Sequence, residues 1–372
     1  MKMFWSLVAT IAFTAFAVGA ENPPAGMVDV FVGGQEGFPT YRIPAIVRAL
    51  DGTLLAFAEG RASKRDQAHN QLVLKISRDG GRSWGSLAII AADGTNSLNN
   101  PTAVVLRGTG RVLLVYQCYR GRFAEFSVVP GYEGEAVCRT WIIYSDDQGR
   151  TWSSPREITR GVKRPTEATS SAAGPGIGVE MAGGPHPGRV IIPFNEGPPG
   201  HWHVYAAYSD DQGATWHRGA AAPETAYTGA NEVQMLELPG GRLLLNARNQ
   251  AGSHQRRVAA SDDGGETWSP LVDDPALVEP RCQAAFLRHP VSTNAAEDVL
   301  LFSNPASPTK RENGRLRVSR DRGRTWSAGK LIYAGSFAYS GLVSLDPATV
   351  GCLFERDNYQ RISFVPLPVN DP

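Results

Sequence analysis

Short runs of apolar and β-branched residues recur along the chain, each bounded by Gly, Pro, Asn or Asp. Runs of this length with a period of two predict β-strands. They fall into five similar sets of three, and such repetition predicts a protein built from small repeated sheets. The first runs cover 42–50, 100–107, 176–182, 232–238 and 282–289, the second runs cover 52–60, 110–118, 188–196, 241–248 and 299–305, and the third runs cover 72–77, 140–145, 203–209, 256–261 and 315–319.

The third run of each set leads into one motif, S-x-D-x-G-x-[ST]-W, which occurs five times and uses five of the eight tryptophans. Its Asp can accept hydrogen bonds from backbone N–H groups further along, and its Gly supplies a conformation that other residues resist. Its Trp can bury a large apolar face beneath the turn. This motif, the Asp box, therefore predicts a tight turn before a fourth strand, with structural rather than catalytic carboxylates. The copies begin at Ser77, Ser145, Ser209, Ser261 and Ser319.

Each set with its Asp box predicts a four-stranded antiparallel sheet of roughly 60 residues. A sixth set, at 339–346, 350–355 and 361–367, has three runs and lacks the box, and the N-terminal run 28–32 can supply its fourth strand. Closed radial repetition protects the edges of sheets. We therefore predict an all-β, six-bladed β-propeller of four-stranded antiparallel blades over residues 21–372, with the last blade closed by the N-terminal strand.

The start of the chain predicts export. Lys2 precedes an apolar stretch from Met3 to Val18, and small residues follow up to Ala20. This order is typical of a cleavable secretory signal peptide, here residues 1–20, and the apolar stretch is short for a spanning helix. We expect a secreted or periplasmic protein, with an uncleaved N-terminal anchor as the alternative.

Charge and cysteine content limit the classes of partner and cofactor. The formal net charge is +1, which gives no indication of nucleic-acid or membrane-surface binding. The cysteines lack CxxC spacing and have no histidines at zinc-site intervals, so neither a metal nor a cofactor is expected. Export would permit a disulfide between Cys118 and Cys138, the pair nearest in sequence. The alternative is that Cys118, Cys138, Cys282 and Cys352 are four buried free thiols.

Polar residues gather at one face of the predicted disc. In an up-and-down blade, the starts of first strands, the ends of second strands and the loops between second and third strands share a face, opposite the Asp boxes. Arg42, Arg248 and Arg311 fall on it from three separate blades. Such a cluster suits a carboxylate or phosphate ligand, and nearby acids and a phenol could perform acid–base chemistry on a glycosidic bond. The same face collects Glu59, Arg61, Asp66, Asn100, Asn195, Glu232, Gln283, Asn304, Tyr339 and Glu355.

These motifs resemble those of the exo-α-sialidases (neuraminidases) of the Asp-box family, in their bacterial and animal branch, over the whole mature chain. The resemblance implies that Tyr41-Arg42-Ile43-Pro44 carries the first arginine of the site. It implies the following roles: Asp66 as acid/base, Tyr339 as nucleophile, Glu232 as its activating carboxylate, Arg248 and Arg311 as the second and third arginines, Arg315 as the alternative to Arg311, and Glu355 as the carboxylate that steadies Arg42.

The implied reaction is hydrolysis of terminal α-linked sialic acids from glycoproteins, glycolipids and oligosaccharides, with retention and by a monomer. Three arginines would hold the sugar carboxylate, and a neutral phenol avoids the repulsion that a carboxylate nucleophile would meet. Arg61 is expected to contact the sugar carboxylate or to pair with Glu59. Candidates for the pockets around the acetamido and glycerol groups are Asn100, Asn195, Trp202 and Gln283.

Two other functions share the repeat pattern. A non-catalytic Asp-box propeller that binds glycans or protein partners has no need of the complete set of polar residues at one face. A sialidase that transfers the sugar to an acceptor, or within the molecule, would have the same catalytic residues. The sequence does not separate transfer from hydrolysis, because the two differ in the shape of the acceptor site.

Overall fold

The computed structural model describes residues 24–224 and 229–369, and the regular secondary structure of this part is almost entirely β-strand, with mostly antiparallel pairing. The predicted signal peptide, residues 1–20, lies outside the described residues. Helical structure in the described part is a short α1 (Thr159–Val162) and a 3-10 turn η1 (Ala295–Glu297). None of the described helices has the length and apolar character needed to cross a membrane.

Five sheets account for the strands of the described residues. The first and second sheets, in strand order, consist of β2 (Thr40–Arg48), β3 (Leu54–Arg61), β4 (Gln71–Ser77) and β5 (Ala88–Ala91), and of β11 (Gly176–Ile177), β6 (Ser97–Val105), β7 (Val112–Tyr119), β8 (Arg139–Ser145) and β9 (Arg156–Glu157). The third and fourth sheets consist of β10 (Ser171–Ala173), β13 (Val190–Glu196), β14 (His203–Ser209) and β15 (His217–Arg218), with β12 (Val179–Glu180) also paired to β13, and of β16 (Ala230–Glu237), β17 (Leu243–Asn249), β18 (Gln255–Ser261) and β19 (Val272–Val278). The fifth sheet consists of β1 (Val28–Val32), β25 (Arg361–Pro368), β24 (Thr349–Arg356), β23 (Lys330–Asp346), β22 (Glu312–Ser319), β21 (Val299–Pro305) and β20 (Ala285–His289).

The fifth sheet joins the two sets predicted as the last two units. Its strand β23 is 17 residues long, and its first half pairs with β22 while its second half pairs with β24. At the other edge β1 pairs antiparallel with β25, with Val28 opposite Phe364. The predicted pairing of the N-terminal run with the last strand is therefore confirmed.

The predicted first strand at 176–182 is wrong in detail. Gly174 and Gly176 have φ of 38° and 133°, and Pro175 between them has no N–H to donate to a ladder. The chain consequently breaks into β10, β11 and β12. Strand β11 runs parallel to β6 of the preceding sheet, and β10 and β12 both pair with β13 of the third sheet.

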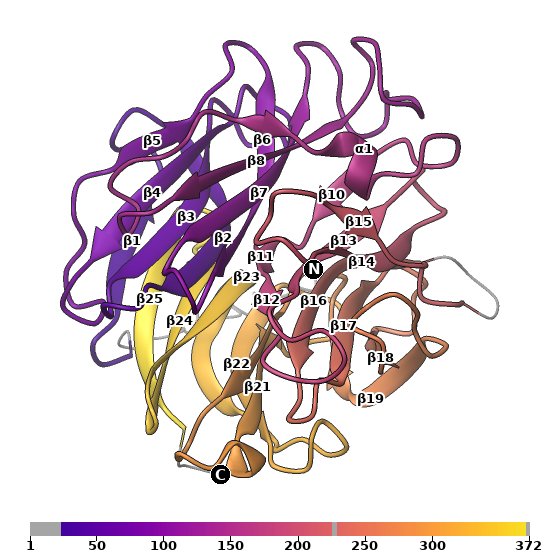
Figure 1. Cartoon of the computed structure of the whole chain (residues 1–372). Helices are drawn as coiled ribbons and strands as arrows, with labels where there is room; N and C mark the ends of the chain where they lie inside the picture. Colours follow the sequence, from indigo (N-terminus) through magenta and orange to yellow (C-terminus); the bar gives the residue numbers. More distant parts are fainter. Residues whose placement is uncertain (1–23, 225–228, 370–372) are drawn as a thin grey trace, which may run out of the picture.

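The inner strands meet around the middle of the molecule. Strand β2 contacts β6 and β23, and β16 contacts β13 and β20, so the last sheet lies beside the first (Figure 1). Apolar side chains fill the space between neighbouring sheets. One such cluster joins Leu55 and Phe57 of the first sheet to Leu114 and Tyr116 of the second. Core packing between sheets therefore holds the inner strands, and with them the side chains at their ends.

The Asp boxes form the predicted turns. In the first box the Asp79 carboxylate accepts the N–H and hydroxyl of Ser83 at 2.9 and 2.6 Å, and Ser77 Oγ accepts the N–H of Gly81 at 2.9 Å. The same bonds recur in the other four boxes. Hydrogen bonds from Ser83 and Ser77 lower the pKa of Asp79 well below its usual value. These carboxylates hold turns, as expected from the sequence.

The Asp boxes also fasten neighbouring sheets together. Gly81 has φ of 90°, and a Cβ added to it would lie 2.1 Å from Phe364 in the fifth sheet. Its neighbour Gly80 has φ of 73° but faces open space. We expect Gly81→Ala to cost about 3 kcal/mol through overpacking and backbone strain, and Gly80→Ala to cost about 1 kcal/mol through backbone strain alone. Thermal unfolding of both variants checks this; equal losses would show that contact with Phe364 is unimportant.

All four cysteines are buried free thiols, so the alternative to a Cys118–Cys138 disulfide holds. Register explains this. Cys118 lies opposite Arg139, so these two side chains share one face of the sheet. Cys138 is the residue before Arg139, and its side chain therefore points to the other face. Cys118 packs among the core residues of the first and second sheets, whereas Cys138 packs with Tyr119 and Val128.

Candidate active site

Register shifts in four strands near the middle of the molecule, β2, β6, β16 and β23, set the direction of several predicted polar side chains. The ladder of β2 shifts register between Arg42 and Ala45, and that of β6 shifts between Asn99 and Thr102. Glu232 lies within a similar shift in β16, and Tyr339 lies within one in β23. A bulge bends its strand and re-aims side chains. Of the five candidates predicted at first-strand starts, Arg42, Asn100, Glu232 and Tyr339 lie at such bulges, whereas Gln283 precedes β20 (Ala285–His289).

A fully buried carboxylate supports the bulge of β2. Glu355 Oε1 in β24 accepts the Arg42 Nε–H at 2.7 Å and the Ile43 N–H at 2.8 Å, and its Oε2 accepts the Tyr339 N–H at 3.2 Å. Ile43 has φ of 60°, which is unusual for a β-branched residue and is held by this bond. Although burial opposes it, Glu355 raises the pKa of Arg42 above its ordinary value. Glu355 thus holds Arg42 through a hydrogen-bonded ion pair.

Tyr339, Glu232 and Arg248 form a connected group. The Tyr339 hydroxyl donates a short hydrogen bond to Glu232 Oε1. Arg248 Nη1 donates to Glu232 Oε2 at 2.8 Å and to Tyr339 Oη at 3.2 Å. Burial, followed by the Glu232 charge, raises the pKa of Tyr339 well above 10. The phenol is therefore neutral at rest, with a carboxylate placed to receive its proton.

Arg42 and Arg311 adjoin the same phenol. Their guanidinium carbons lie 5.3 and 5.4 Å from the centre of the Tyr339 ring. Tyr359, which the sequence analysis missed, joins them: its ring lies 4.0 Å from the Arg42 guanidinium carbon, and its hydroxyl accepts from Arg311 Nη1 at 3.2 Å. It lies in the loop after β24, the kind of loop expected to reach this face, so its position carried a usable signal. The three predicted arginines thus converge, each within reach of Tyr339.

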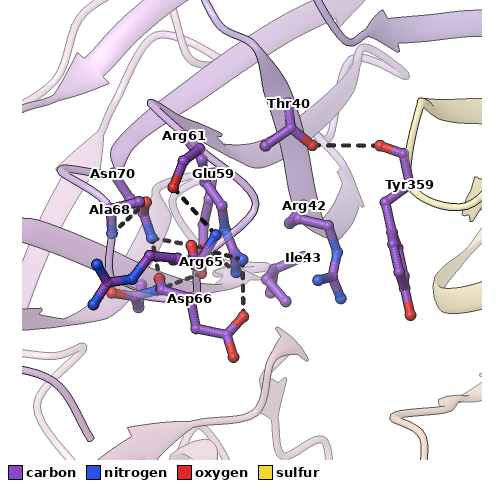
Figure 2. A network of polar contacts seen from close by, with 12 residues as sticks. Thr40, Arg42, Ile43, Glu59, Arg61, Arg65, Asp66, Ala68, Asn70 and Tyr359 are labelled. Carbon is purple, nitrogen blue, oxygen red and sulfur yellow. Dashed lines mark hydrogen bonds and ion pairs between the residues drawn. The ribbon is translucent and has the colours of Figure 1, made fainter.

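A cavity of about 460 Å³ opens beside this group, and Asp66 lies at its edge. The Asp66 carboxylate is 70% exposed and accepts a hydrogen bond from Arg61 Nη1 at 2.8 Å. Partial burial would raise its pKa, but the charge and hydrogen bond of Arg61, together with the charges of Arg42 and Arg311, lower it. Figure 2 shows the Asp66 carboxylate and the Arg42 guanidinium both pointing towards the lower part of the view, with Ile43 between them. The predicted residues that line the cavity are Arg61, Asp66, Asn100, Asn195, Trp202, Glu232, Arg248 and Tyr339.

Arg61 forms ion pairs with two neighbouring carboxylates, those of Glu59 and Asp66. It is 1% exposed, and its Nε donates to Glu59 Oε2 at 2.7 Å in addition to its bond with Asp66. Glu59 Oε1 also accepts the Asn100 N–H at 2.7 Å, so it supports the bulge of β6 as Glu355 supports that of β2. Of the two roles expected for Arg61, the structure shows the pairing with Glu59 directly.

Seven predicted residues are absent from the lining of the cavity: Arg42, Glu59, Gln283, Asn304, Arg311, Arg315 and Glu355. Gln283 is buried and bonds to both backbone groups of Ser340. Asn304 Nδ2 donates to the backbone of Val278. Arg315, the alternative to Arg311, donates to the carbonyl of Gly329 and does not reach the arginine group. The structure therefore favours Arg311 over Arg315.

Glu125 is a cavity residue that the sequence analysis missed. It lies in the loop after β7, where no repeat pattern marks it, and it lines the cavity with Asp66 and Glu232. Burial, followed by the charges of Glu232 and Asp66, raises its pKa to about 7.

We expect Glu125→Gln to stabilise the protein at pH 8 by on the order of 1–3 kcal/mol, but not near pH 4. The folded state keeps the Glu125 proton up to a higher pH than the unfolded state, so the stability penalty grows as pH rises from about 4.5 to about 7. Unfolding in denaturant across this range measures it. An equal effect of the substitution at pH 4 and pH 8 would contradict the shifted pKa.

Among the described residues, no group of three or more His, Cys, Asp or Glu side chains could hold a metal ion. The polar residues of the cavity are instead arginines, carboxylates, amides and two phenols. This donor set suits an anionic polar ligand rather than a cation.

Comparison with known proteins agrees with this geometry. Residues 52–352 match the model of the BNR repeat-like domain family. A sialidase-3 of Mus musculus is 30% identical over 92% of this chain and 95% of its own length. The chain belongs to the sialidase family. A sialidase of Micromonospora viridifaciens is 36% identical, and one of Bacteroides fragilis is 30% identical, over 91% and 87% of this chain.

This sialidase-family chain spans 54% and 61% of the length of those two bacterial relatives. Among solved structures, the Hadza microbial sialidase Hz136 superposes with a TM-score of 0.83 at 29% identity, covering 92% of this chain and 68% of that one. An intramolecular trans-sialidase from Ruminococcus gnavus, in complex with oseltamivir carboxylate, gives a TM-score of 0.78 at 19% identity over 92% of this chain and 97% of that one. The second match shows a common fold.

Proposed function

We propose that the protein is an exo-α-sialidase that hydrolyses terminal α-linked sialic acids from glycoproteins, glycolipids or oligosaccharides. One observation carries this proposal: the neutral Tyr339 hydroxyl is bonded to Glu232 while Arg42, Arg248 and Arg311 surround it. Arginine side chains form strong, often bidentate, hydrogen bonds with carboxylates, and sialic acid bears a carboxylate on its anomeric carbon. A binding module has no need of a phenol coupled to a proton acceptor at this point.

The proposed mechanism retains configuration through a covalent intermediate. The three arginines bind the sugar carboxylate and orient the anomeric carbon toward Tyr339. As the bond to the phenol oxygen forms, Glu232 takes the phenol proton, and the leaving oxygen takes a proton from Asp66. Asp66 then removes a proton from water, which attacks the anomeric carbon and releases Tyr339. Glu232 returns the proton to the phenol.

The acid role of Asp66 requires a change in its surroundings. In the free protein Asp66 is exposed, and Arg61 lowers its pKa. A sugar in the cavity excludes water from the carboxyl and brings a second carboxylate near it, and both effects raise the pKa of an acid. We therefore expect Asp66 to gain its proton as substrate binds.

Under this proposal the catalytic unit is a six-bladed β-propeller completed by β1, exported through the predicted signal peptide and active as a monomer. Support comes from the pairing of β1 with β25 and from the short apolar stretch that ends near Ala20. Gel filtration and N-terminal sequencing of secreted protein test these points. A dimer, or an intact residue 1 in the secreted form, would contradict them.

The deciding test is release of sialic acid. The purified protein should cleave a fluorogenic sialoside, and a panel of α2,3-, α2,6- and α2,8-linked substrates should show its linkage preference. Product analysis separates hydrolysis from transfer, since intramolecular transfer yields an anhydro sugar. Binding of sialosides without any turnover would instead support a non-catalytic Asp-box propeller.

A further inference from the structure

A further buried carboxylate, Glu279, lies behind the arginines after the end of β19. It is fully buried, and its Oε1 accepts the Asn249 N–H at 2.7 Å. Its Oε2 accepts the Cys282 N–H, also at 2.7 Å. Asn249 ends β17 in the fourth sheet, while Cys282 leads into β20 of the fifth sheet. One side chain therefore links the two sheets at the face that carries the site.

Arg256 completes this support and is likewise fully buried. Its Nη1 donates to the Cys282 carbonyl at 2.7 Å and lies 3.5 Å from Glu279 Oε2. Its Nε donates to Asn246 Oδ1 at 2.7 Å. A buried charge is tolerated when it is paired and hydrogen-bonded, and removing one partner is strongly felt. The Arg256 charge is accordingly held by hydrogen bonds to Asn246 and Cys282 and by the nearby Glu279 carboxylate.

The residues next to these anchors bear on the proposed chemistry. Asn249 directly follows Arg248, which bonds to Glu232 and Tyr339. Cys282 directly follows Arg281, whose carbonyl accepts Arg311 Nη2 at 3.0 Å. The backbone at Arg281 is strained, with φ of 56°.

The Cys282 side chain is also part of the support. It packs with Ile43, Ala338 and Tyr339. A shift of the Cys282 backbone would therefore disturb both the carbonyl that holds Arg311 and the packing beneath the phenol.

We propose that Glu279 is a positioning residue for the carboxylate-binding arginines: through the amides of Asn249 and Cys282 it sets Arg248 and Arg311 without touching substrate. This inference rests on the proposed function. Displacements of about 1 Å in a reacting group can cost about 100-fold in rate. A residue that fixes the backbone beside Arg248 and Arg281 is therefore expected to affect turnover.

The test compares Glu279→Gln with Glu237→Gln. Glu237 is 5% exposed and accepts the N–H groups of Ala182 and Gly183 at 2.8 Å each, but it does not line the cavity. Both variants lose one buried charge that bridges two segments. Calorimetry measures binding of a 2,3-dehydro sialic acid and of its methyl ester, and the ratio of the two affinities reports recognition of the carboxylate. Thermal unfolding and kcat are measured alongside.

We expect the preference for the free acid and kcat to fall about 10- to 100-fold in Glu279→Gln, with both at wild-type values in Glu237→Gln, although both variants lose thermal stability. A Glu279→Gln protein that keeps the wild-type preference would overturn the inference. If that variant does not fold, Arg256→Lys takes its place with the same expected loss of preference. Equal binding of the acid and the ester by the wild-type protein would instead contradict the proposed function, and with it the inference about Glu279.

Discussion

Replacing Tyr339 with Phe is expected to reduce kcat on any sialoside by at least about 10³-fold, equivalent to about 4 kcal/mol of transition-state stabilisation. The substitution removes one oxygen, which is the proposed nucleophile and the donor to Glu232. The ring and its contacts with Arg42 and Arg311 remain, so substrate binding should persist. Initial rates and calorimetry with a sialic acid ligand measure the two effects separately.

Tyr333→Phe provides the matched control for this prediction. Tyr333 lies on the same strand, β23, and its hydroxyl bonds to Asp357 at 3.1 Å, away from the cavity. Loss of that hydroxyl should leave kcat unchanged. Near-normal turnover in Tyr339→Phe would exclude Tyr339 as the nucleophile.

Asp66→Ala is expected to lower kcat/KM on a natural sialyl disaccharide by about 10²- to 10⁴-fold, the usual contribution of a general acid. A sugar alcohol is a poor leaving group and needs a proton, whereas a nitrophenol departs readily without one. The loss on an activated aryl sialoside should therefore be much smaller. Parallel kinetics on the two substrates measure this difference.

Asp51→Ala is a control for the loss of a loop carboxylate. Asp51 accepts the Thr53 N–H at 3.0 Å in the loop between β2 and β3, and it does not line the cavity. Removal of the Asp51 carboxylate should leave kcat/KM unchanged on both substrates. Equal losses on both substrates in Asp66→Ala would argue against leaving-group protonation and point to a role in binding.

The sequence predicted most strands because the Asp box and its flanking runs repeat, and each repeat constrains the others. It failed at 176–182, where two glycines and a proline interrupt the pattern locally. It also placed a boundary near residue 339, where β23 runs on without a turn. Both errors arise where backbone conformation, rather than apolar periodicity, decides the path.

The candidate site could be predicted in part, because strand ends in a repeat protein share one face. That rule brought Arg42, Arg248, Arg311 and Tyr339 together. It did not reveal Glu279, which lies in a loop outside the repeat pattern. Its role depends on hydrogen bonds to backbone amides, and such bonds carry no residue-specific signal in a single sequence.

The pairing of β1 with β25 has a consequence for biosynthesis. Strand β1 leaves the ribosome long before its partner at Arg361–Pro368 has been made. Until then its edge groups stay open, and such edges are prone to pair with other chains. A chain truncated before β25 is therefore expected to be more prone to aggregation and proteolysis than one that includes this strand.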